Sequence, residues 1–405
     1  SLYATAYLAT NKPLYKQVVY DTYQFVQREL YNDIGAFYSS LDADSETVTG
    51  ELEEGVYYVW TKEELQVILG NEFELFSNYY NVNAYGKWEK ENYHLIRSSS
   101  DKEFSSKYDI SEIELAKKVK SWKEILLNKR EKRNKPRLDD KTLSSWNALM
   151  LKGYVNAYTA FDDEAFLKLA LKNAQFIVSQ QIKEDGGLFR NYKNGKSNIE
   201  AYLEDYATVI DALITLYEAT LNENWLQTAK QLTDYCYDHF YDDQSKMFFF
   251  TSDKDMALIA RKIETDDNVI SSSNSIMANN LYRLGHYYAN KNYSSNAKTM
   301  LHNIKEKAIT YGAGASNWLN LYANYTGDFY EIAISGNNAK AKLKELNQNY
   351  IPNKLIVGST KDSNLPLLQY KYAEDDTTIY VCVDGACKLP VNEVEKALKQ
   401  IKIQF

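Results

Sequence analysis

The chain has few of the residues that build disulfide frameworks and metal centres. Its 405 residues include three cysteines and four histidines. Three cysteines are too few for a fold held by disulfides, and this number favours a reducing compartment, so we expect a cytoplasmic protein. No two histidines have the spacing of metal ligands, so we expect no metal and no other cofactor.

The sequence also lacks long apolar runs and an excess of basic residues. No apolar run approaches the roughly 20 residues that a membrane-spanning helix needs, and the N-terminus lacks the basic-then-apolar order of a signal peptide. The formal net charge is -8, and basic residues do not alternate with aromatic ones. We therefore expect neither a membrane nor a nucleic acid as a partner.

What the sequence does contain is a series of amphipathic helices arranged in pairs. Apolar residues recur at helical spacing, and short polar links separate the two helices of a pair, which is typical of antiparallel hairpins. Helices are predicted over residues 2–8, 14–30, 143–160, 165–182, 202–220, 225–240, 275–290 and 296–308. Hairpins are followed by tails rich in glycine or aromatic residues, at 35–38, 186–189 and 246–250.

Helix, link, helix and aromatic tail form an internal repeat. Hairpins that repeat in this way can stack side by side and close into a ring, so the expected fold is mainly α, an (α/α) toroid over residues 1–328. Inner helices of such a ring are apolar nearly all round, as residues 202–214 are. A long excursion over residues 35–140 interrupts the repeat, and residues 329–405 predict a small α/β domain.

Shorter signals give detail within the excursion and the terminal domain. The run 54–60 is strand-like, and Thr61 with Glu64 forms a capping box that opens a helix. The terminal domain has the pattern of strands over 329–335, 354–357 and 378–383, with helices over 338–346 and 391–401.

The strongest candidate site lies at the start of one predicted helix. Asp139 and Asp140 stand immediately before it, and Trp146 and Asn147 lie in its first turns. An acidic residue at a helix N-terminus is explained by capping alone, since unpaired N–H groups and the helix dipole favour it. The acidic pair, the tryptophan and the asparagine together favour a binding or catalytic site.

Other polar clusters also occur at helix starts or just after the tails. Asp42 and Asp44 follow the first tail, in a segment that is either a polar loop or part of a site. It is not a calcium loop, because Thr47 stands where such a loop requires glycine. Asp205 and Tyr206 open an apolar helix, whereas Asp211, farther along it, is better explained by a hydrogen bond between helices.

Asn274 and His94 complete the candidate set. Asn274 lies among serines before an apolar helix, where capping accounts for one of these residues. His94 is the histidine that lies in an aromatic, polar loop.

The cysteines give a separate signal. Cys382 and Cys387 flank a glycine-containing turn and have no nearby ligands with which to close a zinc site, so free thiols and a labile disulfide are both compatible with them. We expect adjacent but reduced thiols there, and we expect Cys236 to lie in the core.

Several segments resemble the spermatogenesis-associated protein 20 family. The matching segments are 35–46, 54–60, 138–141 with Trp146 and Asn147, 203–207, 273–275 and 380–390. The resemblance implies a six-hairpin glycosidase-like helical toroid, preceded by a thioredoxin-like module and a first helical hairpin that this sequence lacks. The ring is therefore expected to be open at one side.

Two hypotheses about function follow. The first is a carbohydrate-binding or carbohydrate-processing toroid, glycoside hydrolase-like or epimerase-like, for a sugar or sugar derivative. Carboxylates of Asp42, Asp44, Asp139, Asp140 and Asp205 would be catalytic, and Trp146, Asn147, Tyr206, Asn274 and His94 would bind substrate. The alternative is a non-catalytic binding or redox-accessory scaffold that acts with the upstream thioredoxin-like module.

Overall fold

The computed structural model describes residues 1–255 and 260–402. The chain forms two compact units. Unit 1 consists of Ser1–Ser39 and Asp140–Phe405, and unit 2 consists of Ser40–Asp139. The expected domain boundaries, with an excursion at 35–140 and a division between residues 328 and 329, stay predictions.

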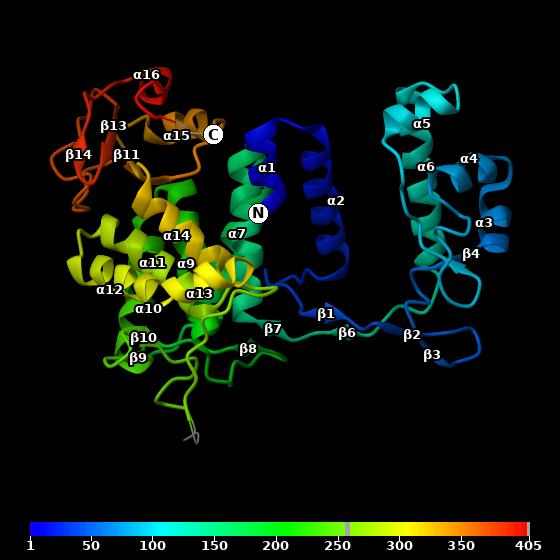
Figure 1. The fold of residues 1–405 in the computed structure, drawn as a ribbon, viewed down its shortest axis with the longest axis horizontal. Helices are drawn as coiled ribbons and strands as arrows, with labels where there is room; N and C mark the ends of the chain where they lie inside the picture. Colours follow the sequence, from blue (N-terminus) through cyan, green and yellow to red (C-terminus); the bar gives the residue numbers. More distant parts are fainter. Residues whose placement is uncertain (256–259, 403–405) are drawn as a thin grey trace. The chain divides into compact units, whose positions relative to one another are not determined.

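Unit 1 is built from helical hairpins, each with one inner and one outer helix, and from a further inner helix, α14. Inner helices lie next to one another in chain order, α1 against α7, α7 against α9, α9 against α11 and α11 against α14 (Figure 1). The inner helices are α1 (Leu2–Thr10), α7 (Ser144–Phe161), α9 (Leu203–Thr220), α11 (Ser273–Tyr287) and α14 (Ser316–Thr326). The outer helices are α2 (Pro13–Glu29), α8 (Glu164–Phe176), α10 (Glu223–His239) and α12 (Lys291–Asn303), with α13 (Lys305–Thr310) after α12.

The central inner helix shows why the sequence places these helices inside. α9 is apolar on nearly every face, and most of its residues are buried. A helix that is apolar all round has to be covered on all sides, and α7, α10 and α11 cover this one. Outer helices such as α10 bury only a stripe, with Leu226, Ala229 and Cys236 inside. The prediction that Cys236 lies in the core is confirmed.

Short β-hairpins follow the outer helices, as the aromatic tails suggested. β9 (Tyr241–Asp242) pairs with β10 (Met247–Phe248), and single bridges join Tyr31 to Phe37 and Ile182 to Leu188 in the corresponding tails. β7 (Thr142–Leu143) pairs with β8 (Asn191–Tyr192) beside the start of α7. The helix expected over 165–182 ends in a π-helical turn at Ile177–Gln181.

The terminal part of unit 1 is a small α/β structure with a mixed sheet in the order β12-β11-β13-β14. β11 (Tyr330–Ser335) pairs parallel to β12 (Lys354–Ser359) and antiparallel to β13 (Thr378–Val383), and β14 (Ala386–Cys387) is an edge strand. α15 (Ala339–Asn347) connects β11 to β12, and α16 (Val394–Leu398) is shorter than the expected helix 391–401. A separate apolar cluster, with Ile332, Ile356 and Val381, forms its core.

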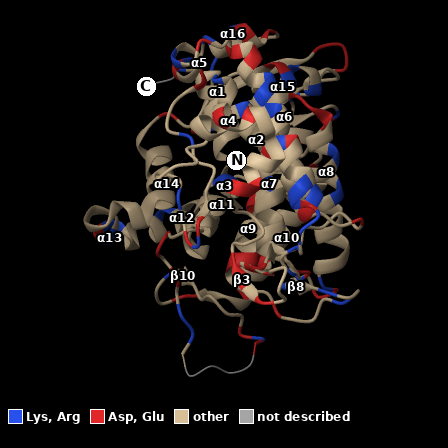
Figure 2. Ribbon diagram, turned by 90° about the vertical axis from the view of Figure 1, so that its right-hand side faces the viewer, with Lys and Arg blue, Asp and Glu red and all other residues tan. Residues whose placement is uncertain are grey.

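Hydrogen bonds and ion pairs join this α/β part to the helical hairpins. The Tyr287 hydroxyl on α11 donates to the Ile356 carbonyl at 2.8 Å, and Lys344 on α15 forms ion pairs with Asp162 at 2.9 Å and Glu164 at 2.8 Å. In Figure 2 the basic residues of α15 appear in blue.

Unit 2 has four helices within its described residues, 40–139, and a core of its own. The helices are α3 (Lys62–Leu69), α4 (Phe73–Tyr79), α5 (Asp101–Lys107) and α6 (Glu112–Arg130). Its short strands are β1 (Ser40–Leu41), β2 (Asp44–Glu46), β3 (Leu52–Glu54), β4 (Trp60–Thr61), β5 (Asn92–Tyr93) and β6 (Leu138–Asp139). Phe76, Leu115 and Trp122 are fully buried in its centre.

One local prediction in unit 2 is confirmed and one is wrong. The capping box of Thr61 and Glu64 is present at the start of α3. The single strand expected over 54–60 is instead the end of β3, a turn and the start of β4. Gly55 explains the difference, because its φ of 71° bends the chain where a strand would need extended backbone.

The structure confirms the expected fold class, a mainly α arrangement of (α/α) hairpins of the toroid type with a small α/β part. Within the described residues, no helix is long and apolar enough to cross a membrane.

Candidate functional site: the central cavity of the helical hairpins

A large cavity lies at the centre of unit 1, between the inner helices. Its volume is about 1370 Å³, and every inner helix contributes to its lining. Because α1, α7, α9, α11 and α14 all face this one space, the hairpins are arranged around a common axis, as the ring prediction requires. Helical residues of the lining include Thr5, Lys152, Asn156, Asp211, Asn279, Arg283, Asn317 and Asn320.

A network of ion pairs joins three inner helices at the cavity wall. Lys152 Nζ on α7 lies 2.6 Å from Asp211 Oδ2 on α9, and Arg283 Nη1 on α11 lies 2.9 Å from Asp211 Oδ1. Arg283 Nη2 also reaches Glu218 Oε2 at 3.0 Å. Asp211 therefore has the partner on a neighbouring helix that the sequence favoured for it, and it also lines the cavity.

The same network continues to the sheet. The Tyr287 hydroxyl lies 2.8 Å from Glu218 Oε1 and shares its one proton between that oxygen and the Ile356 carbonyl, and the backbone N–H of Ile356 on β12 donates to Glu218 Oε1 at 3.3 Å. Both oxygens of Glu218 are thus occupied, one by Arg283 and the other by these two donors. A partly buried charge with a full set of partners holds a fixed position.

The cations decide the protonation state of Asp211. Burial alone would raise its pKa, but Lys152 and Arg283 outweigh burial and hold the pKa of Asp211 below its ordinary value. Burial likewise opposes the charge of Arg283, yet Glu218 and Asp211 raise the pKa of that guanidinium. Asp211 is therefore an ionised acceptor and is poorly suited to donate a proton.

Side-chain amides dominate the rest of the polar lining. Asn279 on α11 donates to the Ser275 carbonyl at 2.9 Å and to the Asn317 carbonyl at 3.2 Å, which joins α11 to α14. Asn156 and Asn320 line the cavity from α7 and α14. An amide offers both donors and an acceptor, so this lining suits a ligand that carries many hydroxyl groups.

The residues expected from the sequence to form the site lie elsewhere. Asp42, Asp44, Asp139 and His94 belong to unit 2, and the other candidates belong to unit 1. Asp42 is exposed beside Arg137, with Oδ2 at 3.7 Å from Nη2, Asp44 begins β2, and Asp139 pairs with Ser40 in the β1–β6 ladder. A shared site for the full candidate set stays a prediction.

His94 is exposed, and its ring lies against Trp88 with the ring centres 4.9 Å apart.

Asp140 and Asp205 form ion pairs near the N-terminal ends of α7 and α9. Asp140 pairs with Lys193, which lowers the pKa of that carboxyl. Asp205 is fully buried and accepts from the backbone N–H groups of Ser145 at 2.9 Å and Tyr202 at 3.0 Å, and Arg190 lies 3.0 Å away. Burial raises the pKa of Asp205 to about 6, against the opposing effect of Arg190.

Asn147, Tyr206 and Asn274 hold the tails against the inner helices. Asn147 accepts from the Phe37 N–H at 2.8 Å and donates to the Phe37 carbonyl at 3.0 Å. Asn274 makes the same pair of bonds to Phe248, both at 2.9 Å. The Tyr206 hydroxyl accepts from the Leu188 N–H at 2.7 Å. These side chains therefore have a structural role in each repeat.

Trp146 differs from its neighbour Asn147, because it is 41% exposed on the first turn of α7. An exposed indole is free to stack on a ligand, and its assignment as a sugar-stacking residue stays a prediction.

Metal binding has no visible basis in the described part of the chain. Residues 1–255 and 260–402 contain no group of three or more His, Cys, Asp or Glu side chains that could hold a metal ion.

Sequence reasoning missed the charged and amide residues of the cavity wall. Lys152 and Arg283 each follow an apolar or aromatic residue on a helix with many buried positions, which was the available signal. Asn320 lies on α14, a helix that the sequence did not predict. Its segment is rich in asparagine and tyrosine, and Trp318, Leu321 and Tyr325 in it have the spacing of an apolar helix face.

Helical hairpins around one polar cavity, joined to a mixed sheet, define the class as a mainly α protein of the (α/α) toroid type. Within that class, the chain is similar to spermatogenesis-associated protein 20. It is 27% identical to the human protein over 96% of this chain and 55% of the relative, and 26% identical to the mouse protein over 98% of this chain and 56% of the relative. The predicted resemblance to that family is confirmed, and the chain spans about half the length of these curated relatives.

Other comparisons give weaker likenesses. A glycoside hydrolase family 76 α-mannanase from Bacteroides thetaiotaomicron has a TM-score of 0.37 and 14% identity, over 89% of this chain and 92% of that chain. A cellobiose 2-epimerase from Bacillus thermoamylovorans has a TM-score of 0.35 and 11% identity, over 73% of each chain. No family model matches the sequence.

Proposed function

We propose that unit 1 binds a sugar or sugar derivative in its central cavity. The observation that carries this proposal is the lining of the cavity, in which asparagine side chains from α7, α11 and α14 surround a space of about 1370 Å³. Ligand sites of ordinary size occupy about 300–1,000 Å³, so there is room for more than one sugar ring with associated water.

The ion-pair network supports recognition of hydroxyl groups. Asp211 is ionised and is held by Lys152 and Arg283, so its oxygens keep one position whether or not a ligand is present. Fixed polar groups lose little freedom on binding, and the wide amide lining can then supply donors and acceptors around the rings.

Glycoside hydrolysis in this cavity has less support than binding. Such chemistry needs one protonated and one ionised carboxyl on the two sides of the bond. The lining carboxylates in the described residues are Asp211 and Asp328, and the cations keep Asp211 ionised. We therefore propose binding as the activity of the cavity itself.

Binding of immobilised and free sugars tests the proposal. The protein is screened on a glycan array, and each hit is measured by calorimetry for the wild type and for the cavity variants Asn156→Leu and Asn320→Leu. Loss of the amide groups is expected to weaken binding at least tenfold, which corresponds to about 1.4 kcal/mol. Asn292→Leu, an exposed residue of the outer helix α12, is the matched control and should bind like the wild type.

An array without saturable hits would contradict the proposal. Equal affinities for the wild type and both cavity variants would move the binding site away from this cavity.

The candidate catalytic carboxylates require a separate test. Asp139→Asn and Asp140→Asn are compared with the wild type in product formation from each sugar that binds. Lower turnover with unchanged affinity would support a catalytic role for these two carboxylates, because a group that acts only in the transition state changes the rate and not ground-state binding. Unchanged turnover in both variants would remove these two residues from the catalytic set.

A further inference from the structure

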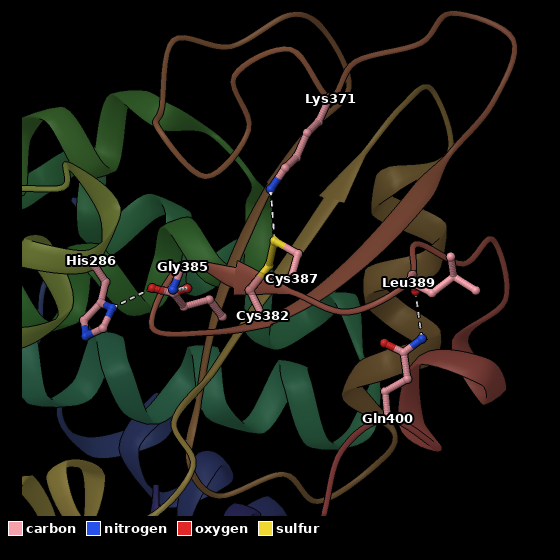
Figure 3. Close-up of a disulfide and its surroundings, with 8 residues drawn as sticks. His286, Lys371, Cys382, Gly385, Cys387, Leu389 and Gln400 are labelled. Carbon is pink, nitrogen blue, oxygen red and sulfur yellow. Dashed lines mark hydrogen bonds and ion pairs between the residues drawn. A yellow bond between two sulfur atoms is a disulfide. The ribbon is translucent and has the colours of Figure 1, made fainter.

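The structure corrects the expectation of reduced thiols at the edge of the sheet. Cys382 on β13 and Cys387 on β14 are joined by a disulfide (Figure 3). The two residues face each other in the register of the β13–β14 ladder. The sequence left this outcome open, because four intervening residues permit a cross-strand bond and do not require it.

A tight hairpin brings the two sulfur atoms together independently of the bond. Val383 pairs with Ala386, so Asp384 and Gly385 alone form the loop. Their φ angles are 50° and 77°, the left-handed values of a type I′ turn, and Asp-Gly is a favoured sequence for that turn. The thiols therefore stay adjacent after reduction, and the disulfide can form again without unfolding of the chain.

The two cysteines differ in their access to solvent. Cys382 is fully buried, whereas Cys387 is exposed on the edge strand. Attack on a disulfide sulfur requires access to that sulfur, so an incoming thiolate can reach Sγ of Cys387 and is kept from Sγ of Cys382.

A cation lies beside the exposed sulfur. Lys371 Nζ is 3.7 Å from Sγ of Cys387, and Figure 3 shows the side chain pointing at that atom. A nearby ammonium group stabilises a thiolate relative to a thiol. Burial lowers the pKa of Lys371, and Glu331 raises it in opposition. The other charged groups nearby on the hairpin are Asp384 and Lys388, and Lys388 bonds to the carbonyl of Gln400.

The core of the α/β part does not depend on the bond. The apolar cluster of that part contains Ile379 and Val381 from β13 but neither cysteine. β13 is also held along its full length by β11. A bond that closes a loop this short contributes little loop-closure entropy, so its reduction should leave the sheet folded.

We propose that Cys382 and Cys387 form a thiol–disulfide exchange site, at which a dithiol reductant attacks Sγ of Cys387. The Cys382–Cys387 bond breaks as a mixed disulfide forms on Cys387, and Cys382 Sγ leaves with the bonding electron pair and takes up a proton. The second thiolate of the reductant then attacks the reductant's other sulfur, the one bonded to Cys387 in the mixed disulfide. This step closes the reductant's disulfide and releases Cys387 as a thiolate beside Lys371. Two electrons pass from the dithiol, which becomes a disulfide, to the cysteine pair.

The hairpin turn also connects the exchange site to the cavity wall. The Gly385 N–H donates to Glu331 Oε2 at 2.9 Å, and Glu331 Oε1 lies 2.6 Å from Nδ1 of His286 on α11. Arg283, one turn earlier on the same helix, holds Asp211 in the cavity. One side chain, Glu331, therefore links the hairpin of the two cysteines to His286 on the inner helix α11.

The first experiment measures exchange on the native full chain. The protein is equilibrated in buffers with varied ratios of reduced to oxidised glutathione and with dithiothreitol, and free thiols are then alkylated and assigned by mass spectrometry. The pair is expected to pass reversibly between the oxidised and reduced forms while circular dichroism stays unchanged. Cys236 should remain unmodified under native conditions, because it is fully buried and burial raises the pKa of its thiol. A pair that stays oxidised in excess dithiothreitol would overturn the proposal.

The second experiment tests the role of the cation. In the reduced protein, the alkylation rate of Cys387 is measured against pH for the wild type, Lys371→Gln and the matched control Lys388→Gln. Lys371→Gln is expected to slow alkylation at pH 7 about three- to tenfold, the effect of half to one pKa unit. Lys388→Gln should change it less than about twofold.

The second measurement is repeated in a Cys382→Ser background, in which Cys387 is a free thiol without its partner and Cys236 stays buried. Equal rates in Lys371→Gln and the wild type, in both backgrounds, would overturn the assignment of Cys387 as the activated sulfur.

Discussion

Single asparagine side chains hold the repeats of unit 1 together, because they form hydrogen bonds to backbone groups of the tails that have no backbone partner there. Asn147 and Asn274 each satisfy one N–H and one carbonyl of a buried tail residue, Phe37 and Phe248. The sequence showed these asparagines as polar residues at helix starts, which is also how ligand-binding residues appear. Burial distinguishes the two roles, because both residues are fully buried.

Loss of one of these amides should destabilise unit 1 substantially. Asn147→Ala leaves a buried N–H and a buried carbonyl without partners, so the free energy of unfolding is expected to fall by about 2–4 kcal/mol. Asn224→Ala, an exposed residue on the outer helix α10, should change it by less than about 0.5 kcal/mol. Urea unfolding followed by circular dichroism measures both values, and equal stabilities of the two variants would contradict the structural role.

Asp205 should make stability depend on pH in an unusual direction. Burial raises its pKa to about 6 in the folded chain, against about 3.9 for an unfolded aspartate. The folded state therefore binds the proton more tightly, and this group lowers stability as pH rises from about 4 to about 6. Replacement by asparagine removes that loss.

The unfolding free energy of Asp205→Asn relative to wild type should thus rise between pH 4 and pH 7, by on the order of 2 kcal/mol. Glu204→Gln is the control, since Glu204 contacts the same Arg190 with its side chain partly exposed. A difference that is independent of pH would show that Asp205 has the same pKa in the folded chain as in the unfolded chain.

At the scale of elements, two glycines that look alike in the sequence differ in how closely a neighbouring helix packs against them. Gly285 on α11 faces α12, and a Cβ there would lie 2.2 Å from Ser294 Oγ and 3.1 Å from the Ser294 backbone nitrogen. Gly153 on α7 has space, with its nearest contact at 3.8 Å. Helix propensity favours alanine at both positions, so packing decides the sign of each substitution.

Gly285→Ala is expected to destabilise the protein by about 1–3 kcal/mol, because the two helices have to move apart. Gly153→Ala should instead stabilise it by up to about 1 kcal/mol, since alanine loses less backbone freedom on folding. Thermal unfolding of the two variants measures the contrast. A stabilising Gly285→Ala would show that Ser294 can rotate away at little cost.

The elements themselves were largely predictable, because their signals are local. Paired helices with short links, the capping box at Thr61 and three strands of the sheet all follow from periodicity and turn residues. α14 was missed although Trp318, Leu321 and Tyr325 have the spacing of an apolar helix face. The cavity wall could not be predicted, because Lys152 and Arg283 obtain their partners from other helices, and one sequence does not show which helix faces make contact.

At the scale of the whole molecule, the division into two units has a physical basis in their separate cores. Unit 2 buries Trp122, Phe76 and Leu115 in a cluster made entirely of its own residues, and unit 1 has a different main cluster. Ser40 and Asp139, at the two ends of unit 2, are directly paired in the β1–β6 ladder. Paired residues in an antiparallel ladder have Cα atoms only about 4.5–5.5 Å apart, so the first and last residues of unit 2 lie next to each other.

Each unit should therefore fold without the other. Residues 40–139, expressed alone, are expected to be helical and to unfold cooperatively in urea, because the roughly 100-residue length is enough for one core. Unit 1 is obtained by joining Ser39 to Asp140 through a short Gly-Ser link, which only has to span the gap that the β1–β6 pair closes. It should keep the affinity of the full chain for any sugar bound in the central cavity, since the lining residues all belong to unit 1. Loss of that affinity in a folded unit 1 would contradict the proposal that the central cavity alone forms the binding site.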